Sequence, residues 1–367
     1  MNNDENLYRL ALSKVDGIGP IRYKKLVEHF GSAKEVFSKS IRQLKSVYGI
    51  SQSNSMAIKS FSDFNTIEKE ILFAEKNNIL ILGLNDEAYP QRLRQCIDSP
   101  SFLFYKGSAS LNHPRIISII GTRSFTDYGR RACEEIIEGL KTYDVMVTSG
   151  LAFGIDAIAH KACLKHHLPT VGVVAHGLDS IYPIEHIGLS REMQTNGGVL
   201  SEYFSGTKPD KGNFPTRNRI VAGMADATLI IETDLKGGSI ITGEIAYSYN
   251  RDLLCVPGRI SDSKSNGCNF LIKSLKGQMV TCADDIANCM GWGLPKIAKP
   301  LQRQLFIELN EDEEVIVSLL KQHEKLHIDE FYTKSFLNSS ELASSLLSLE
   351  MQNIIQIMPG KIVSLLD

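Results

Sequence analysis

The sequence predicts an α/β protein built around a doubly wound, mostly parallel sheet, with a helical domain before the sheet and a small third domain after it. Apolar runs of strand length alternate with helical stretches between residues 116 and 256, the pattern of a parallel sheet with crossover helices. The run from Ile116 to Ile120 has Ser118 as its one polar member, as expected for a strand buried on both faces. A chain of 367 residues also exceeds the usual size of a single core, so we expect two or three domains.

Residues 5–77 show helical rather than strand periodicity. The stretch from Val15 to Pro20 is a glycine-rich turn that enters a helix at Pro20, and Gly31 ends that helix. This stretch resembles a helix-hairpin-helix, a module whose hairpin amides grip nucleic-acid phosphates, and a poorer second copy begins at Tyr48. The alternative is a small helical packing domain that contacts no DNA.

Strand candidates follow one another along the rest of the chain. They lie at residues 79–84, 102–106, 116–120, 144–148, 170–174, 198–202, 227–231 and 253–256. Near the end of the sequence, a helix at 342–349 precedes two short apolar runs that flank Pro359 and Gly360. A helix followed by a β-hairpin suggests a winged-helix module. Its recognition helix would lack basic residues, so we expect a protein contact or a packing role.

Composition narrows the functional class. The formal net charge is -2, so any phosphate-binding surface must be a local patch. Residues 1–13 lack the apolar core of a signal peptide and no run reaches the length of a membrane span, which predicts a cytoplasmic protein without a membrane partner. The seven cysteines form no Cys-x-x-Cys pair, which predicts reduced thiols and no metal site.

The chemistry is expected where the strands end. Gly121 stops the first buried strand, and the turn up to Ser124 carries Arg123 before a helix that starts at about Thr126. A helix N-terminus has unpaired amides and a positive dipole end, so this turn suits an anion. A tight turn whose arginine pairs with a surface carboxylate is the alternative reading. After the second strand, Ser149 could also donate a hydrogen bond to an anion, and small residues such as Gly150 let a ligand approach.

Two later segments add cations. Between Ser201 and Gly223, four cations interleave with an aromatic residue, a combination that suits the phosphates and unpaired bases of a single strand. The cations are Lys208, Lys211, Arg217 and Arg219, and the aromatic residue is Phe214. A solvated loop followed by a helix is the alternative. Lys236, Gly237, Gly238 and Ser239 then open another helix, giving a second anion site of the same kind.

Two histidines near strand ends invite a catalytic interpretation. His160 lies on a predicted helix without a nucleophile motif nearby, and His176 belongs to a stretch rich in turn residues. We therefore expect both to be structural, and we expect no catalytic residue and no cofactor.

Seven motifs, in this order and at these strand ends, resemble the DprA/Smf family of bacterial DNA-processing proteins. They are Gly121 to Gly129, Ser149 to Asp156, Gly177 to Pro183, Leu200 to Tyr203, Phe214 to Gly223, Gly238 to Thr242 and Val256 to Gly258. The resemblance covers residues 80–285 closely. It implies an extended Rossmann-like domain that binds single-stranded DNA without catalysis, forms a homodimer, protects incoming DNA in natural transformation and loads the RecA recombinase.

The resemblance and the strand-end residues together define an expected DNA-contact set. It comprises Gly121, Thr122, Arg123, Ser124, Ser149, Gly150, Lys211, Phe214, Arg217, Asn218, Arg219, Lys236, Gly238 and Ser239. The family pattern is broken at Ala175-His176-Gly177, at His186 and at Met224-Ala225, which puts the third strand-end loop in doubt. The expected domains are 1–78 (helical, like a helix-hairpin-helix or SAM domain), 79–290 (Rossmann-like, DNA-binding), 291–308 (linker) and 309–367 (winged-helix-like).

The main rival is a nucleotide-binding or nucleotide-hydrolysing enzyme of the LOG or lysine-decarboxylase-like group. Gly237, Gly238 and Glu244 match part of the glycine-rich loop of that group, but Lys236 stands where that group has proline. A nicotinamide dehydrogenase is weaker still, because the first strand-to-helix turn lacks a Gly-x-Gly-x-x-Gly motif. A duplex-binding regulator is a third possibility, which requires the terminal domains to be basic.

Overall fold

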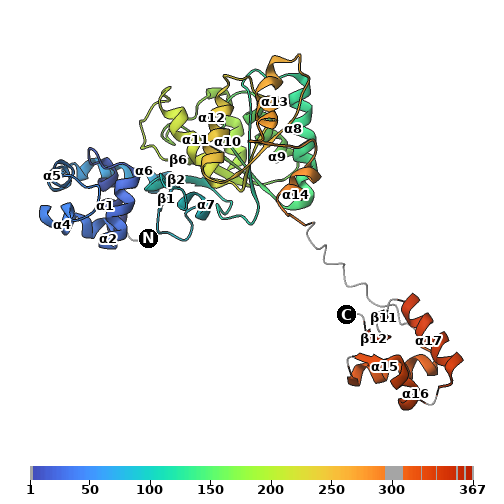
Figure 1. Cartoon of the computed structure of the whole chain (residues 1–367). Helices are drawn as coiled ribbons and strands as arrows, with labels where there is room; N and C mark the ends of the chain where they lie inside the picture. Colours follow the sequence, from blue (N-terminus) through green and yellow to red (C-terminus); the bar gives the residue numbers. More distant parts are fainter. Residues whose placement is uncertain are drawn as a thin grey trace. The chain divides into compact units, whose positions relative to one another are not determined.

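The central sheet has nine strands in the order β1-β2-β6-β5-β4-β3-β7-β8-β9. Figure 1 shows β1, β2 and β6 of this sheet beside the helices that precede it. The computed structural model describes residues 3–293, 309–323, 325–335, 337–352, 354–358 and 361–365. They fall into two units, residues 1–295 and residues 296–367. Most of the predicted linker 291–308 lies outside the described residues, and the predicted boundary near residue 78 divides the first of these units.

The strands coincide closely with the predicted ones. They are β1 (Leu80–Gly83), β2 (Phe102–Gly107), β3 (Ile116–Ile120), β4 (Met146–Ser149), β5 (Thr170–Val173), β6 (Gly197–Ser201), β7 (Ala227–Ile230), β8 (Asp252–Cys255) and β9 (Gln278–Met279). The strands from β3 to β9 pair in parallel, and β1 and β2 add an antiparallel edge. The predicted mostly parallel α/β sheet is therefore confirmed. The prediction missed β9, a two-residue edge strand that is exposed and has no apolar run.

Helices cover both faces of this sheet. They are α7 (Gln91–Arg94), α8 (Asp127–Leu140), α9 (Ile155–Lys165), α10 (Ile187–Met193), α11 (Asn213–Met224), α12 (Gly238–Ser248), α13 (Asn266–Lys273) and α14 (Ala283–Cys289). Alternate residues of β3 serve the two layers: Ile117 and Ile119 pack with α8, α9 and α14, whereas Ile116 and Ile120 pack with α7, α11 and α13. This is why β3 is apolar along its whole length.

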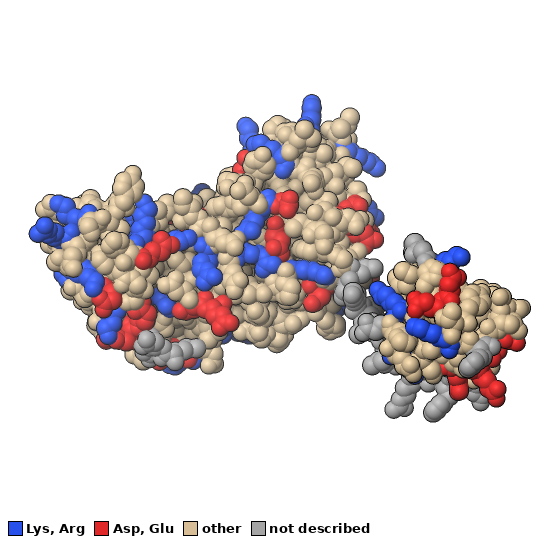
Figure 2. Space-filling model, turned by 60° about the horizontal axis from the view of Figure 1, so that its bottom comes forward, with Lys and Arg blue, Asp and Glu red and all other residues tan. Residues whose placement is uncertain are grey.

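The chain before the sheet is helical, as predicted. Its helices are α1 (Asn3–Lys14), α2 (Pro20–Phe30), α3 (Ala33–Ser38), α4 (Ile41–Lys45), α5 (Gln52–Ser60) and α6 (Phe64–Lys76). The helices α2 to α5 enclose a core of their own, and α1 and α6 share a second apolar cluster with Phe102 and Phe104 of β2. Several Lys and Arg side chains lie on the outer end of this helical segment, at the left of Figure 2.

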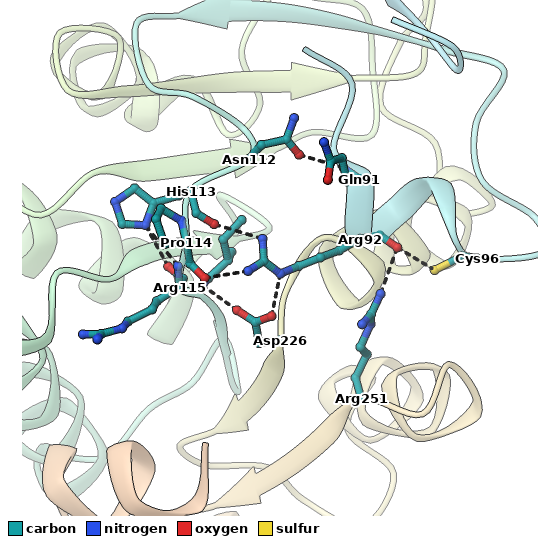
Figure 3. A network of polar contacts seen from close by, with 10 residues as sticks. Gln91, Arg92, Cys96, Asn112, His113, Pro114, Arg115, Asp226 and Arg251 are labelled. Atoms are coloured by element: carbon teal, nitrogen blue, oxygen red, sulfur yellow. Dashed lines mark hydrogen bonds and ion pairs between the residues drawn. The ribbon is translucent and has the colours of Figure 1, made fainter. Parts of the chain in front are cut away.

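A polar network holds the start of β3, opposite the end at which Gly121 stands (Figure 3). The Asp226 carboxylate accepts hydrogen bonds from Arg92 Nε at 2.5 Å and from the Ile116 amide at 2.9 Å. Arg92 also donates to the carbonyls of His113 and Pro114, at 2.9 and 2.8 Å. The network therefore ties α7, the loop before β3 and the residue before β7 together, and it leaves the other end of these strands free for a ligand.

The second unit combines helices with a small antiparallel sheet of order β10-β12-β11. Its elements are α15 (Glu311–His323), β10 (Lys325–His327), α16 (Ile328–Lys334), α17 (Ser339–Met351), β11 (Ile355–Met358) and β12 (Ile362–Leu365). Phe331, Leu342, Leu349 and Val363 are among the residues of its buried core. The predicted turn at Pro359 and Gly360 lies outside the described residues.

Candidate nucleic-acid interface

A cleft of about 490 Å³ opens at the carboxyl ends of β3, β4 and β7. The chain moves outward from β3 through β4, β5 and β6, then returns to place β7 on the other side of β3. The loops after β3 and β7 therefore part at this point, which is where open parallel sheets bind ligands. The lining side chains include five cations, Arg123, Lys211, Arg217, Lys236 and Lys264, against two carboxylates, Asp156 and Asp234.

Phe214, in the first turn of α11, meets two of these cations. The guanidinium carbons of Arg123 and Arg217 lie 5.5 and 6.0 Å from the centroid of its ring, within the range of cation–π attraction. Tyr182 approaches the same ring at 6.3 Å between centroids. Arg123 is exposed and Phe214 is half-buried, so a charged group and an aromatic face reach the solvent side by side.

Arg217 lies at the floor of the cleft, where its guanidinium bonds to the backbone instead of extending toward a ligand. It is buried and donates to the backbone carbonyls of Gly150 and Val173. A Cβ at Gly150 would stand 2.7 Å from the guanidinium, so glycine is needed there. Burial lowers the pKa of Arg217 to about 10, partly opposed by the charge of Asp156. Arg217 therefore remains a cation at neutral pH.

The helix N-termini at the cleft differ from the prediction. The turn after β3 was expected to offer the N-terminus of α8 to an anion, but the carboxylate of Glu232, just after β7, already occupies it. Glu232 accepts from the Thr126 amide at 2.9 Å and from the Thr126 hydroxyl, and the Thr126 side chain caps the Gly129 amide. The sequence could not indicate this contact, because Glu232 and Thr126 are separated by more than a hundred residues.

A second carboxylate, that of Asp156, holds the loop between β4 and α9. Asp156, in the first turn of α9, accepts from the amides of Gly150 and Ala152 at 3.1 and 3.4 Å. Burial raises the pKa of Asp156, and the charge of Arg217 opposes that rise.

The N-terminus of α12, where the second anion site is expected, borders the cleft. Its N-cap is Gly237, which makes no side-chain capping bond, and Lys236, Gly238 and Ser239 line the cleft beside it. A Cβ at Gly237 would lie 2.3 Å from the Thr233 hydroxyl, so the turn requires glycine. Free amides and a flanking lysine make this the helix end at which an anion can bind.

Most of the expected contact residues come together here, and three do not. The cleft is lined by Gly121, Thr122, Arg123, Gly150, Lys211, Phe214, Arg217, Asn218, Lys236, Gly238 and Ser239. Ser124 is exposed on the rim of the turn, outside this lining. Ser149 is buried and its hydroxyl donates to the Ile119 carbonyl at 2.6 Å, and Arg219 is buried in an ion pair with Glu202.

The sequence reading missed Lys264, which contributes to the lining from the 3-10 turn Ser263–Ser265. It follows no strand directly, and the nearest glycine, Gly267, lies inside the next helix, so the strand-end pattern used for the other residues did not include it. Its place depends on the packing of this turn against the loop after β7, where the Gly267 amide donates to the Thr233 carbonyl.

The histidines and the glycine-rich loop have no catalytic arrangement. His160 is buried against the Thr170 hydroxyl at 2.7 Å, and burial lowers its pKa to about 3. His176 is buried with its ring nitrogens engaged by the Gly177 carbonyl and the Tyr182 amide. Glu244, which matches the acidic residue of the nucleotide-hydrolase loop motif, forms an ion pair with Lys276 and is not part of the cleft lining.

Among the described residues, no group of histidine, cysteine and acidic side chains could hold a metal ion. Within the same residues, every helix is too short or too polar to cross a membrane.

Residues 80–291 match the model of the protein family described as DNA recombination-mediator protein A. The protein Smf of Synechocystis is 35% identical over 280 residues, which is 74% of this chain and 69% of that protein. The X-ray structure of DNA processing protein A from Streptococcus pneumoniae superposes with a TM-score of 0.68 at 30% identity, covering 77% of this chain and 97% of that one. A structure describing the single-stranded DNA binding mode of the Helicobacter pylori protein matches with a TM-score of 0.53 at 29% identity, over 58% and 97% of the two chains.

Proposed function

The chain belongs to the DNA recombination-mediator protein A family, whose members act on DNA without being enzymes, and we propose that it binds single-stranded DNA in the cleft at the ends of β3, β4 and β7. The observation that carries the proposal is the meeting of Arg123, Lys211 and Lys236 with the ring of Phe214 in one cleft. Cations neutralise successive phosphates whatever the sequence, and an aromatic ring stacks on any unpaired base.

The roles of the predicted residues divide into two groups. We propose that direct contacts to the strand come from Gly121, Thr122, Arg123, Ser124, Lys211, Phe214, Asn218, Lys236, Gly238 and Ser239, and from Lys264 in addition. Ser149, Gly150 and Arg217 would support the cleft from beneath. We leave Arg219 out of the interface, because its charge is satisfied by Glu202 away from the cleft.

The test is a titration of labelled oligo-dT of increasing length, with a duplex of the same length as competitor. We expect affinity to rise with length and to exceed duplex affinity at equal salt. Each phosphate contact should add about 0.7 to the slope of log affinity against log salt. A flat dependence on salt and length, or tight binding and turnover of a nucleoside monophosphate, would argue for the nucleotide enzyme instead.

We further propose that the bound strand is incoming DNA in natural transformation, and that the protein loads RecA onto it in the cytoplasm. The support is family membership and the single-stranded DNA binding described for the Helicobacter pylori relative. The assay is RecA filament formation on single strands already covered by a competing single-strand-binding protein. We expect this protein to shorten the lag, and an unchanged lag would contradict the loading role.

The family resemblance also led us to expect a homodimer, and we propose that two copies meet at the β9 edge of the sheet. Phe270, Leu275 and Met279 lie within ten residues of sequence there and are exposed by 48, 91 and 57%. An open strand edge next to apolar side chains is a surface that a second copy can cover. Met279→Glu should convert a dimer into a monomer in light scattering, and a monomeric wild type would contradict the proposal.

For the terminal parts of the chain, we propose a helix-hairpin-helix or SAM-like fold for residues 1–78 and a winged-helix-like fold for residues 309–367. The acidic and apolar character of α17, with Leu347 and Met351 exposed beside Glu350, supports a protein contact rather than a DNA contact for the latter.

A further inference from the structure

A cation lies beside an aromatic ring at both ends of the chain that runs from β6 to the first turn of α11. At the far end, Arg123 lies 5.5 Å from the ring centroid of Phe214 in the cleft. At the near end, the Lys14 ammonium lies 4.2 Å from the ring centroid of Phe204. Both distances are within the range of cation–π attraction. The pairing found in the cleft therefore occurs a second time, ten positions earlier in the chain.

The Phe204 pair is held in a fixed position. The Phe204 ring stands nearly perpendicular to the rings of Phe102 and Phe104, with centroids 5.4 and 5.8 Å away. The Glu70 carboxylate, on α6, accepts hydrogen bonds from the Ser205 amide at 2.8 Å and from the Ser205 hydroxyl. The turn after β6 is thus tied to the helical segment, and a ligand there meets a surface that needs little ordering.

A hollow of about 360 Å³ opens beside this pair, and we call it the Phe204 hollow. Its lining comes from α1, α6 and the loop after β6, and includes Lys14 and Lys69, which are both exposed. The acid in the lining is Glu70, which is buried and bonded to Ser205. The hollow therefore presents two lysine charges and an aromatic ring, a combination that suits the phosphates and the unpaired bases of a single strand.

The Phe204 hollow and the cleft are close neighbours along one loop. Thr207 lines the hollow and Lys211 lines the cleft, four positions later. Four residues span at most about 14 Å, the length of about four nucleotides at the rise of about 3.4 Å per nucleotide in a B-form strand. Lys208, a cation noted in the sequence and absent from the cleft lining, is exposed between them. Asp210, the acid of this stretch, accepts from the Gly212 amide at 2.8 Å.

We propose that a single strand leaving the cleft passes Lys208 and enters the Phe204 hollow, where Lys14 and Lys69 contact its phosphates and Phe204 stacks on a base. This inference rests on the proposed single-strand function of the cleft and extends that site to a second one on the same molecule. A duplex fits less well, because stacking on Phe204 requires an unpaired base. One protein molecule should therefore occupy more nucleotides than the cleft alone can hold.

The test measures binding of labelled oligo-dT, from about 4 to about 16 nucleotides long, to full-length variants over a series of salt concentrations. Lys14→Glu combined with Lys69→Glu should lower the affinity for the longest oligomers about tenfold or more, and reduce the magnitude of their salt slope by about 1.4, two contacts at about 0.7 each. The shortest oligomers, which the cleft alone can hold, should bind as they do to the wild type. Lys161→Glu with Lys165→Glu, two exposed lysines on α9, is the matched control.

Phe204→Leu tests the stacking contact separately. Leucine keeps an apolar side chain against Phe102 and Phe104 but removes the aromatic face. Affinity for the longest oligomers should fall about fivefold or more, while their salt slope stays the same because no phosphate contact is lost. Wild-type affinity of this variant at every length would exclude Phe204 as a stacking platform.

Arg123→Glu distinguishes failure of this inference from failure of the proposed function, because it should remove binding at every length. A wild type that does not bind oligo-dT, or an Arg123→Glu variant that binds it normally, would refute the single-strand cleft itself. With Arg123→Glu behaving as expected, normal binding of the longest oligomers by the Lys14 and Lys69 double variant would refute the second site alone. Equal losses at all lengths, or a larger loss for a duplex than for oligo-dT, would refute it too. Should the charge reversals not fold, Lys14→Gln with Lys69→Gln gives the same comparison with a smaller expected loss.

Discussion

The Arg123 guanidinium carbon lies 5.5 Å from the centroid of the Phe214 ring, although the two residues are separated by ninety positions in the chain. Arg123 follows β3 and Phe214 begins α11, so the contact joins the loops of two parallel strands over the cleft. A cation that can follow a phosphate therefore lies directly beside a ring that can stack on the attached base.

Arg123→Glu should leave the fold intact and remove most of the single-strand binding. Arg123 is exposed and its contact with the Phe214 ring lies at the surface, so its replacement costs little stability. A carboxylate in the cleft would repel the phosphates that the wild type attracts, and we expect oligo-dT affinity to fall by more than about tenfold at low salt. Fluorescence anisotropy with labelled oligo-dT measures this loss.

The control is Arg131→Glu, the same charge reversal on an exposed position of α8. It changes the net charge equally and should alter oligo-dT affinity little. Equal losses in both variants would mean that the effect is one of overall charge, and that the cleft is not the binding site.

Phe214→Ala should weaken binding through stacking rather than through charge. Loss of one aromatic platform costs about 1 to 3 kcal/mol per base, while the number of phosphate contacts stays the same. We therefore expect lower affinity with an unchanged salt slope, measured over the same salt series. Tyr247→Ala removes an exposed aromatic residue on α12 and serves as control. A reduced salt slope in Phe214→Ala, without the loss of affinity expected from lost stacking, would assign Phe214 a purely structural role.

The sheet could be predicted because its central strands are fully buried. Every residue of β3, β4, β5 and β7 is buried, and the apolar residues that these strands carry stand out whatever surrounds them. β9 escaped prediction for the opposite reason, since two exposed residues at an edge carry no hydrophobic pattern.

For the cleft, the sequence could predict which types of residue take part, but not which of them face the ligand. Arg123, Lys211 and Phe214 follow from local motifs, but whether a cation faces the ligand depends on partners far away in the sequence. Arg219 looks equivalent to Arg217 in the sequence, two residues away, yet Arg219 turns to Glu202. Which carboxylate fills a helix N-terminus, as Glu232 does for α8, is likewise decided by packing between strands.

Gly129→Ala should destabilise the fold without touching the cleft directly. A Cβ at Gly129 would lie 2.2 Å from Glu232 Oε2, so either the helix or the buried carboxylate must move. We expect a loss of about 1 to 3 kcal/mol, as is typical of overpacking, seen as a lower Tm in thermal unfolding. Gly188→Ala is the control, because nothing lies within 4 Å of a Cβ there. Equal Tm values for the two variants would contradict the tight capping of α8 by Glu232.

The Glu202 carboxylate is a buried acid with an incomplete set of partners. Its Oε2 accepts from Arg219, and its Oε1 is buried without a hydrogen-bond partner among the described residues. Burial raises the pKa of Glu202 from its ordinary value of 4.5 to about 7, with the charge of Arg219 opposing the rise. Between these two pH values the folded protein keeps a proton that the unfolded chain has released.

The sign of the effect on stability follows from that proton. A raised folded-state pKa means that the free energy of unfolding declines as pH rises from about 4.5 to about 7, by at most about 1.4 kcal/mol per pH unit for a single group. Glu202→Gln keeps the shape but cannot ionise, so its stability should decline less over this range. Denaturant unfolding at pH 5, 6, 7 and 8 compares the two proteins, with Glu244→Gln, which alters a more exposed ion pair, as control. Parallel curves for wild type and Glu202→Gln would show that Glu202 is ionised throughout and that Arg219 outweighs its burial.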